Sequence, residues 1–283
     1  MILSYHPCVE ADKNFLCAGR EPDTDDLAAI KAAKAVILPQ GCYASLYEMA
    51  TNNCPHVFPN FDARFGFPGK IGQSRLFRKA RVPCPETEIY LNVDTFYTQH
   101  PGAPKQYTRK YPFVFKFDWG GEGDQVYLID DVDALQSVLQ VARRCEKTGQ
   151  SGFVLQEYIP THRRSLRVVV IGQSLISYWR VQKNRDKFGS GLAAGAEIDA
   201  DSDPDLQKAA IDSVKAFCNT TSINLAGFDI LYSTKKDKME PLFLEINYYF
   251  GRRGLGGSER FYEILNREVK KWIDSLNLSS VDK

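Results

Sequence analysis

No stretch of the 283-residue chain approaches the run of about 18 apolar residues that a membrane-spanning helix needs. The first fifteen residues also lack the basic segment followed by an apolar one that a secretory signal shows. The charges nearly cancel, with 36 lysines and arginines against 35 aspartates and glutamates, whereas a dedicated nucleic-acid binder usually carries a strong basic excess. These absences argue against membrane and nucleic-acid partners and lead us to expect a cytoplasmic protein.

Cysteine spacings typical of metal or redox sites are missing as well. The seven cysteines are widely separated, and none forms a CxxC pair or a Cys/His pair at zinc spacing. We therefore expect reduced thiols. A charged fraction of 25% and an aromatic fraction of 12% are ordinary for folded proteins, and the length predicts about two domains.

The first sixty residues alternate between strand-like and helix-like segments. The expected strands are residues 2–5, 35–39 and 56–59, and the expected helices are residues 23–35 and 45–53. This alternation predicts a small parallel sheet with helices on it. No GxGxxG motif accompanies it, so a dinucleotide site is not indicated.

The rest of the chain is richer in long strands. A polar, proline-containing connector at residues 99–112 is the predicted joint between domains. The expected strands that follow are residues 112–117, 125–129, 152–159, 165–172, 175–182, 227–233 and 241–247, and the expected helices are residues 131–145, 204–219 and a last one from residue 258.

The strongest chemical signal lies in the last two predicted strands, which flank a charged turn. If that turn is centred on Asp237, Asp229 lies directly opposite Glu245, and Asn247 shares their face of the sheet. The alternating apolar residues of the same strand then point to the core: Leu242, Leu244 and Ile246. Like charges opposite each other destabilise a sheet unless something compensates, and two carboxylates with an amide suit a hard cation such as Mg²⁺. The alternative is a solvent-facing strand with ordinary polar residues.

A lysine and a glycine-rich loop form a second signal. Lys116 ends an apolar strand, and Gly120, Gly121 and Gly123 follow it closely. A lysine beside a loop with many exposed backbone N–H groups can cradle phosphate, although an ordinary glycine-rich hairpin turn would look the same.

The segment LQEYI is a third candidate. Gln156, Glu157, Tyr158 and Ile159 end a strand and can form a hinge that reads adenine through its backbone and ribose through Glu157. An edge strand that leaves the sheet is the alternative reading.

Two arginines interrupt otherwise buried strands. Arg167 lies within SLRVVVIG, and Arg180 ends SYWR. A buried charge without a partner is costly, so each arginine needs an anion, which can be a phosphate ligand or an internal carboxylate.

The order of these features resembles that of ATP-grasp ligases, in the branch that contains RimK-like proteins and glutathione synthetases. The matching stretches are PGKIGQSRLFRKARVPCPET, PFVFKFDWGGEG, LQEYI, SLRVVVIGQSLISYWR and AGFDILY with PLFLEIN. The resemblance covers roughly residues 69–256. It implies an α+β, ATP-grasp fold, in which two α+β subdomains clasp ATP, preceded by a short pre-ATP-grasp α/β domain with a small parallel sheet.

The resemblance also implies domain limits. Residues 1–68 would form the shortened pre-ATP-grasp domain, and residues 69–283 the ATP-grasp body. Within that body, about 105–158 would be the small lobe with the phosphate loop, and about 159–283 the C-terminal lobe with the metal site.

The resemblance further implies an activity, cofactors and partners. ATP with Mg²⁺ or Mn²⁺ would activate a small-molecule or peptide carboxylate as an acylphosphate, which an amine acceptor then attacks. The enzyme would be an ATP-dependent ligase, and a homo-oligomer is compatible with the sequence. A phosphotransferase on the same fold and a non-catalytic nucleotide-binding module are the alternatives.

Site residues follow from the same resemblance. Lys70 and Lys116 would contact the nucleotide together with the glycine loop, and the hinge would hold the base. Asp229, Glu245 and Asn247 would bind the metal, as the strand pairing also indicates. The catalytic residues would be Arg167 and Arg180, and Arg180 would stabilise charge on the transferring phosphoryl group.

Two loops depart from the family pattern. In FGSGLAAGA the usual asparagine is Gly191, and two usually basic positions are Ala193 and Ala194, so a contact there is missing or comes from Lys183 or Asn184. In the second loop the small residues that usually follow the metal asparagine are replaced by Tyr248, Tyr249 and Phe250, with Arg252 and Arg253 next. The altered second loop is compatible with either a bulky aromatic or an acidic substrate.

Overall fold

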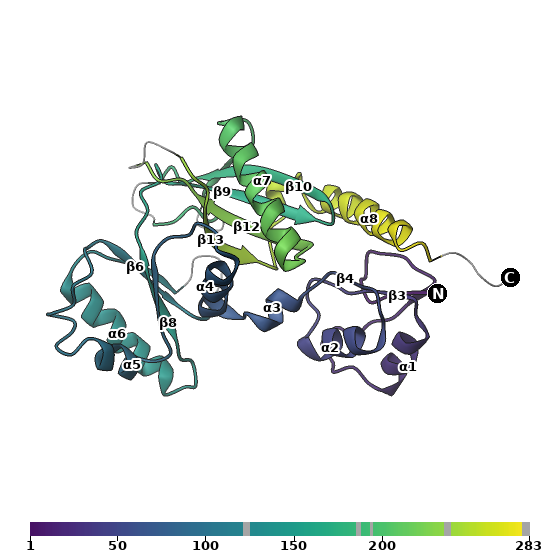
Figure 1. Ribbon diagram of the computed structural model, residues 1–283, viewed down its shortest axis with the longest axis horizontal. Helices are drawn as coiled ribbons and strands as arrows, with labels where there is room; N and C mark the ends of the chain where they lie inside the picture. Colours follow the sequence, from purple (N-terminus) through teal and green to yellow (C-terminus); the bar gives the residue numbers. More distant parts are fainter. Residues whose placement is uncertain (121–124, 185–187, 193–194, 235–238, 279–283) are drawn as a thin grey trace.

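A computed structural model describes residues 1–120, 125–184, 188–192, 195–234 and 239–278, which form three sheets and the helices that cover them (Figure 1). The strands are β1 (Ile2–Ser4), β2 (Lys13–Asn14), β3 (Ala35–Ile37), β4 (Val57–Phe58), β5 (Thr87–Tyr90), β6 (Phe113–Phe117), β7 (Val126–Ile129), β8 (Phe153–Glu157), β9 (Arg164–Ile171), β10 (Ser174–Val181), β11 (Glu197–Asp199), β12 (Leu225–Leu231) and β13 (Leu242–Asn247). The helices are α1 (Thr24–Ala32), α2 (Ala44–Asn53), α3 (Asp62–Gly66), α4 (Gly69–Ala80), α5 (Val93–Gln99), α6 (Val132–Glu146), α7 (Pro204–Thr221), α8 (Ser258–Ser275) and the 3₁₀ turn η1 (Arg253–Leu255). In this described part of the chain, no helix combines the length and the apolar character needed to cross a membrane.

The N-terminal sheet is small and parallel, which confirms the sequence prediction. Its strand order is β2-β1-β3-β4, and α1 and α2 pack on its core. Asp23 starts α1 with a capping box, in which its side chain and that of Asp26 each accept a hydrogen bond from the other's backbone. The two-residue strand β2 was not predicted.

The second sheet, which we call the small-lobe sheet, is antiparallel with the order β5-β8-β6-β7, and α5 and α6 pack with it around an aromatic core. This sheet includes β5, which lies before residue 105, where the small lobe was expected to begin. The connector 99–112 is not a joint between domains, so that prediction was wrong. Tyr107 from this connector is buried in the small-lobe core, and both Tyr107 and Arg109 donate hydrogen bonds of 2.7 Å to Glu88 on β5.

The third sheet, which we call the large-lobe sheet, is antiparallel with the order β11-β10-β9-β12-β13. Alternate residues of β9 face opposite sides, so Leu166, Val168 and Val170 pack with α7, whereas Val169 and Ile171 pack with α8. The α8 side also contacts the N-terminal sheet, since residues of β3 and β4 belong to the same core cluster. Arg167 lies on the α8 side of the sheet, together with Val169 and Ile171. Residues directly opposite Arg167 on the neighbouring strand therefore also face α8.

Helix α8 is attached to the large-lobe sheet through a buried carboxylate. Glu268 is 1% exposed and accepts hydrogen bonds from the backbone N–H of Gln173, in the turn between β9 and β10, at 3.0 Å and from the hydroxyl of Ser174, the first residue of β10, at 2.9 Å. Lys271 donates a further bond of 2.9 Å. Burial alone would raise the pKa of Glu268, but the hydrogen bonds from Lys271 and from the turn outweigh it, so the pKa lies below its ordinary 4.5.

Candidate active site between the small-lobe and large-lobe sheets

The paired acidic residues of β12 and β13 lie where the sequence placed them. Asp229 is opposite Glu245, and Gly227 is opposite Asn247, which matches the register expected from a turn centred on Asp237. Asp237 itself lies outside the described residues. The neighbouring strand β9 brings Arg167 opposite Asp229 on its other side, and the predicted metal residues are therefore brought together with an arginine on one face of the sheet.

A β-bulge interrupts this register on the side toward the turn. Ile230 pairs with Phe243 rather than with Leu244, so the ladder shifts after Asp229. Phe243 and Ile246 are therefore buried in the core, whereas Leu244 is only half-buried and lines a pocket with Glu245. The prediction that Leu244 points to the core was wrong, because alternation fails where one strand carries an extra residue.

Asp229 is the anion that both buried arginines require. Its Oδ1 accepts hydrogen bonds from Arg167 Nε at 2.6 Å and lies 2.8 Å from Arg180 Nη2. Its Oδ2 is 3.3 Å from Arg167 Nη2 and accepts a hydrogen bond from Asn247 Nδ2 at 3.2 Å. Arg180 Nη2 also donates to Ser165 Oγ at 2.7 Å, and Arg180 Nε is buried with no partner among the described residues. Asp229 is thus an internal carboxylate that serves as the partner of both arginines.

These arginines determine the charge state of Asp229. Burial alone would raise the pKa of this carboxyl, but Arg167 and Arg180 outweigh that effect and hold the pKa below its ordinary 3.8. Gly227 leaves the room that this network occupies, because a Cβ there would lie 2.8 Å from Arg167 Nη1. Asp229 is thus ionised at neutral pH and tightly packed between the arginines.

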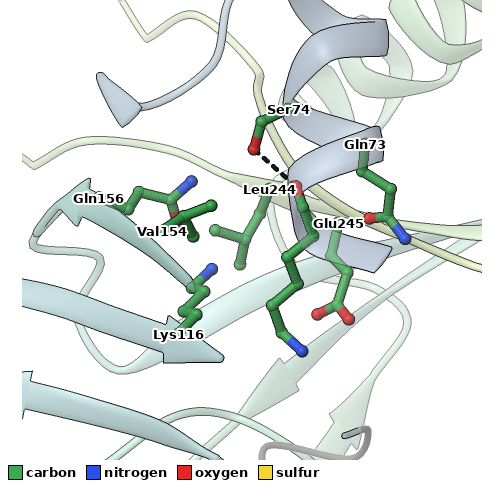
Figure 2. A pocket seen from close by; sticks show the side chains of 8 residues that line it. Gln73, Ser74, Lys116, Val154, Gln156, Leu244 and Glu245 are labelled. Carbon is green, nitrogen blue, oxygen red and sulfur yellow. Dashed lines mark hydrogen bonds between the residues drawn. The ribbon is translucent and has the colours of Figure 1, made fainter. Parts of the chain in front are cut away.

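A pocket beside this network is lined by both predicted lysines, Lys70 and Lys116, and by Glu245. Figure 2 shows Lys116 and Glu245 among the side chains that line it. Its lining residues come from α4, the small-lobe sheet and β13, and they are Lys70, Gln73, Ser74, Lys116, Val154, Gln156, Leu244 and Glu245. The space between these side chains is about 10 Å³, which is close to the volume that one water centre needs. Ligand pockets in proteins measure about 300–1,000 Å³, so the space between these side chains is too small, as it stands, for a nucleotide.

Lys116 is a buried base in this pocket. It is 8% exposed, and burial lowers its pKa from 10.5 to about 8. Glu245 and Asp229 raise the pKa in part, and Lys70 lowers it further. No described carboxylate forms a direct ion pair with Lys116, so its ammonium is available to an anionic ligand that enters the pocket.

Lys70 reaches the start of the glycine-rich loop. Its Nζ donates to the backbone carbonyls of Trp119 and Gly120, each at 3.3 Å. The side chain of Asp118, at the end of β6, accepts a 2.7 Å bond from the backbone N–H of Ile71 and so caps the start of α4. Of the predicted loop glycines, Gly120 lies here at a positive φ of 90°, whereas Gly121 and Gly123 lie outside the described residues.

The predicted hinge connects the two lobes. Gln156 is buried, lines the pocket and donates to Thr87 Oγ1 at 3.0 Å. Glu157 is exposed at the end of β8, and its backbone N–H donates to the Glu86 carbonyl at 2.8 Å. Tyr158 is half-buried, with its ring 6.3 Å from that of Phe188, and Ile159 is 8% exposed.

Two polar residues of the pocket, Gln73 and Ser74, were not predicted from the sequence, and neither was the apolar Val154. Gln73 and Ser74 both lie one turn after Lys70 on α4 and therefore share its side of the helix. Gln73 exchanges two hydrogen bonds with the backbone of Ile246 on β13, each of 2.9 Å. The spacing after Lys70 was the only available signal, and nothing in the sequence pointed to the partner strand.

The loop after Asn247 packs against the N-terminal domain. Tyr248 is half-buried between the two cores, and its backbone carbonyl accepts a hydrogen bond from Gln40 Nε2 at 3.2 Å. The Arg64 guanidinium lies 5.5 Å from the Tyr249 ring and donates to the Gln40 carbonyl at 2.6 Å. Tyr249 stays 63% exposed. Phe250 is buried against α8, so two of the three aromatic substitutions serve packing.

The other altered loop is described only in part. Ala193 and Ala194 lie outside the described residues. Lys183, which sequence analysis offered as a substitute contact, is exposed and pairs with Glu197 on β11. The backbone carbonyl of Asn184 accepts a hydrogen bond from Arg163, and neither residue lines the pocket.

The oxygen atoms of Glu245 and Asn247 fit Mg²⁺, whereas those of Asp229 are already used by other partners. Glu245 makes no ion pair with any described residue, and Asn247 turns its Nδ2 toward Asp229, which leaves its amide oxygen for a ligand. Carboxylate and amide oxygens are suitable ligands for this ion. All lone-pair directions of Asp229 are used by Arg167, Arg180 and Asn247, so Asp229 could bind a metal only by giving up one of these contacts.

Comparisons with known proteins agree with this geometry. Residues 70–268 match the model of the RimK-like ATP-grasp domain. The glutamate–LysW ligase ArgX of Sulfolobus acidocaldarius is 26% identical over 165 residues, which are 57% of this chain and 56% of that protein. The chain thus spans little more than half the length of the curated relatives it matches.

Solved structures show the same fold. A RimK-domain ATP-grasp protein from Sphaerobacter thermophilus has a TM-score of 0.59 at 17% identity, over 84% of this chain and 81% of that one. The D-cycloserine synthetase DcsG has a TM-score of 0.61 at 15% identity, over 96% of this chain and 100% of that one. The ATP-grasp fold predicted from the sequence is therefore confirmed, and since the family model matches well over half of its residues, the chain belongs to the RimK-like ATP-grasp family.

Proposed function

We propose that this protein is an ATP- and Mg²⁺-dependent ligase that joins a carboxylic acid to an amine through an acylphosphate. The observation that carries the proposal is the pocket in which Lys70, Lys116 and Glu245 meet between two sheets, next to the Asp229 network. Family membership supports it, as do relatives whose names are ligase and synthetase.

In this proposal the cationic residues of the pocket would bind phosphate, and its oxygen ligands would bind the metal. Lys70 and Lys116 would bind the phosphates of ATP and hold them in line with the acid, while residues Gln156 to Ile159 would hold the base. Glu245 and the amide oxygen of Asn247 would hold Mg²⁺, which when bound neutralises phosphate charge. Arg180, with its unpartnered Nε, would stabilise charge on the transferring group.

The proposed reaction has two steps, and neither requires a nucleophile from the protein. A carboxylate oxygen of the acid attacks the γ-phosphorus, the bond to the β-phosphate oxygen breaks, and ADP leaves. The amine next attacks the acyl carbon, phosphate leaves, and the amine proton passes to solvent. Closure of the two sheets over the reactants would exclude water, which would otherwise hydrolyse the acylphosphate.

An amino acid is our proposed acid, and the acceptor is an amine on a small molecule or a carrier protein. The curated relative is named a glutamate ligase that acts on LysW, which supports both parts of the proposal. We further propose that the enzyme works in the cytoplasm, where its cysteines, all free in the described residues, would stay reduced.

Hydroxylamine trapping tests the proposal. The protein is incubated with Mg·ATP, hydroxylamine and single amino acids, beginning with glutamate, and both ADP and hydroxamate are measured. A ligase gives hydroxamate together with ADP, and Glu245→Gln should abolish both. ADP with a phosphorylated acceptor and no hydroxamate would indicate a phosphotransferase. ATP binding with no ADP release for any acid would indicate a non-catalytic module.

A further inference from the structure

Strand β13 is the edge of the large-lobe sheet, and it carries both available metal-binding candidates. The sheet order ends at β13, so the outward backbone groups of this strand have no neighbouring strand to pair with. Ile246 lies between Glu245 and Asn247, and its side chain is 2% exposed in the core. Whatever fixes the backbone of Ile246 therefore sets the direction of the side chains on both sides of it.

Gln73 supplies the missing pairing. Its Nε2 donates to the Ile246 carbonyl, and its Oε1 accepts from the Ile246 N–H, each at 2.9 Å. One side-chain amide thus makes the two hydrogen bonds that a further strand would make. Figure 2 shows Gln73 reaching from α4 to a position beside Glu245.

This pairing matters because the strand is irregular just before Glu245. The bulge leaves Leu244 without a partner on β12, so the ladder alone does not fix the peptide that carries Glu245. Gln73 is also one turn from Lys70 on α4. The same helix therefore carries a lysine of the pocket and the residue that holds the metal-binding strand.

We infer that Gln73 is a positioning residue that fixes the Ile246 peptide and thereby aims Glu245 and Asn247 at the cleft. This inference rests on the proposed function, because it assumes that these two side chains hold Mg²⁺. Both polar atoms of the Gln73 side chain bond the Ile246 backbone, so Gln73 acts through β13 rather than as a ligand of its own. Residues that orient metal ligands in this way typically change metal affinity by 10- to 100-fold when they are replaced.

The test uses Gln73→Met, which keeps the length of the side chain and removes both hydrogen bonds. Mg²⁺ is titrated into protein and ADP, and ADP binding is followed by calorimetry. We expect the Mg²⁺ concentration at half-saturation to rise about 10-fold or more, whereas ADP affinity without Mg²⁺ changes less than about 2-fold. Hydrogen exchange should also speed up at the Ile246 amide. Arg75→Met, an exposed position on the same helix, is the matched control.

The outcomes separate the two proposals. A melting temperature that falls in Gln73→Met while the Mg²⁺ half-saturation stays at the wild-type value would show a merely structural role and overturn the inference. Gln73→Asn, which is polar but one methylene shorter, replaces Gln73→Met if that variant does not fold, and it should also raise the half-saturation. Wild-type protein that binds ADP without any Mg²⁺ dependence would overturn both the inference and the proposed function.

Discussion

Lys116 should take up a proton when nucleotide enters the cleft. Burial lowers its pKa from 10.5 to about 8, so in the free protein at pH 8 about half of the molecules carry a neutral amine at this position. The shift corresponds to roughly 3 kcal/mol that disfavours the charged ammonium. Phosphate oxygens in contact with Lys116 favour the charged form and move the pKa back up.

The expected number of protons taken up follows from the fraction of Lys116 that is neutral in the free protein. At pH 8 about 0.5 proton per bound ADP should be taken up from the buffer, and at pH 6.5 almost none, because Lys116 is then already protonated. The ADP phosphates do not interfere at pH 8, since their second pKa is about 6. Affinity for Mg·ADP should accordingly fall as the pH rises above about 8.

Calorimetry in two buffers of different ionisation enthalpy measures the number of protons taken up. Lys116→Arg, which stays charged throughout, should bind ADP with no uptake, and Lys116→Met should bind weakly with no uptake. Uptake that is absent in the wild type at pH 8, or that persists in Lys116→Met, would refute the placement of Lys116 against the phosphates.

Two further predictions concern stability. Asp229→Asn leaves Arg167 and Arg180 buried without their anion, so urea unfolding should show a loss of about 3–5 kcal/mol, and a loss below about 1 kcal/mol would contradict the ionic network. Glu268→Gln should cost about 1–3 kcal/mol at pH 7. Because the folded pKa of Glu268 is depressed, the stabilisation is present above about pH 4.5 and is lost as the pH falls through the folded value, so the difference between wild type and variant should narrow below pH 4.5. A difference that does not depend on pH would show that the charge of Glu268 is not what matters.

Local pattern and turn position were enough to predict the main elements of the site. Four of the five strands of the large-lobe sheet were predictable from their apolar residues, whereas β11 was not predicted. The turn centre gave the pairing of Asp229 with Glu245. The bulge was not predictable, because one extra residue leaves no mark in the pattern. Its effect was to move Leu244 from the core to the pocket.

Contacts between distant segments were the other part that the sequence could not supply. The sequence indicated that Arg167 and Arg180 each need an anion, but several carboxylates along the chain were possible partners for them. The partnership of Gln73 with Ile246 joins residues 173 positions apart and depends on how a helix meets a sheet edge. The connector 99–112 was predicted to be a linker because it is polar. Its Tyr107 is nevertheless buried, and the hydroxyl of this tyrosine donates a hydrogen bond to Glu88.

Transfer of ¹⁸O from a labelled acid to phosphate tests the central claim most directly. An amino acid that supports hydroxamate formation is prepared with ¹⁸O in its carboxyl group and incubated with Mg·ATP and hydroxylamine, and the phosphate is analysed by mass spectrometry. We expect one ¹⁸O atom in each phosphate released, because the acid oxygen that attacks the γ-phosphorus leaves with the phosphate. Phosphate without the label, formed at the same rate with or without the acid, would contradict the ligase mechanism.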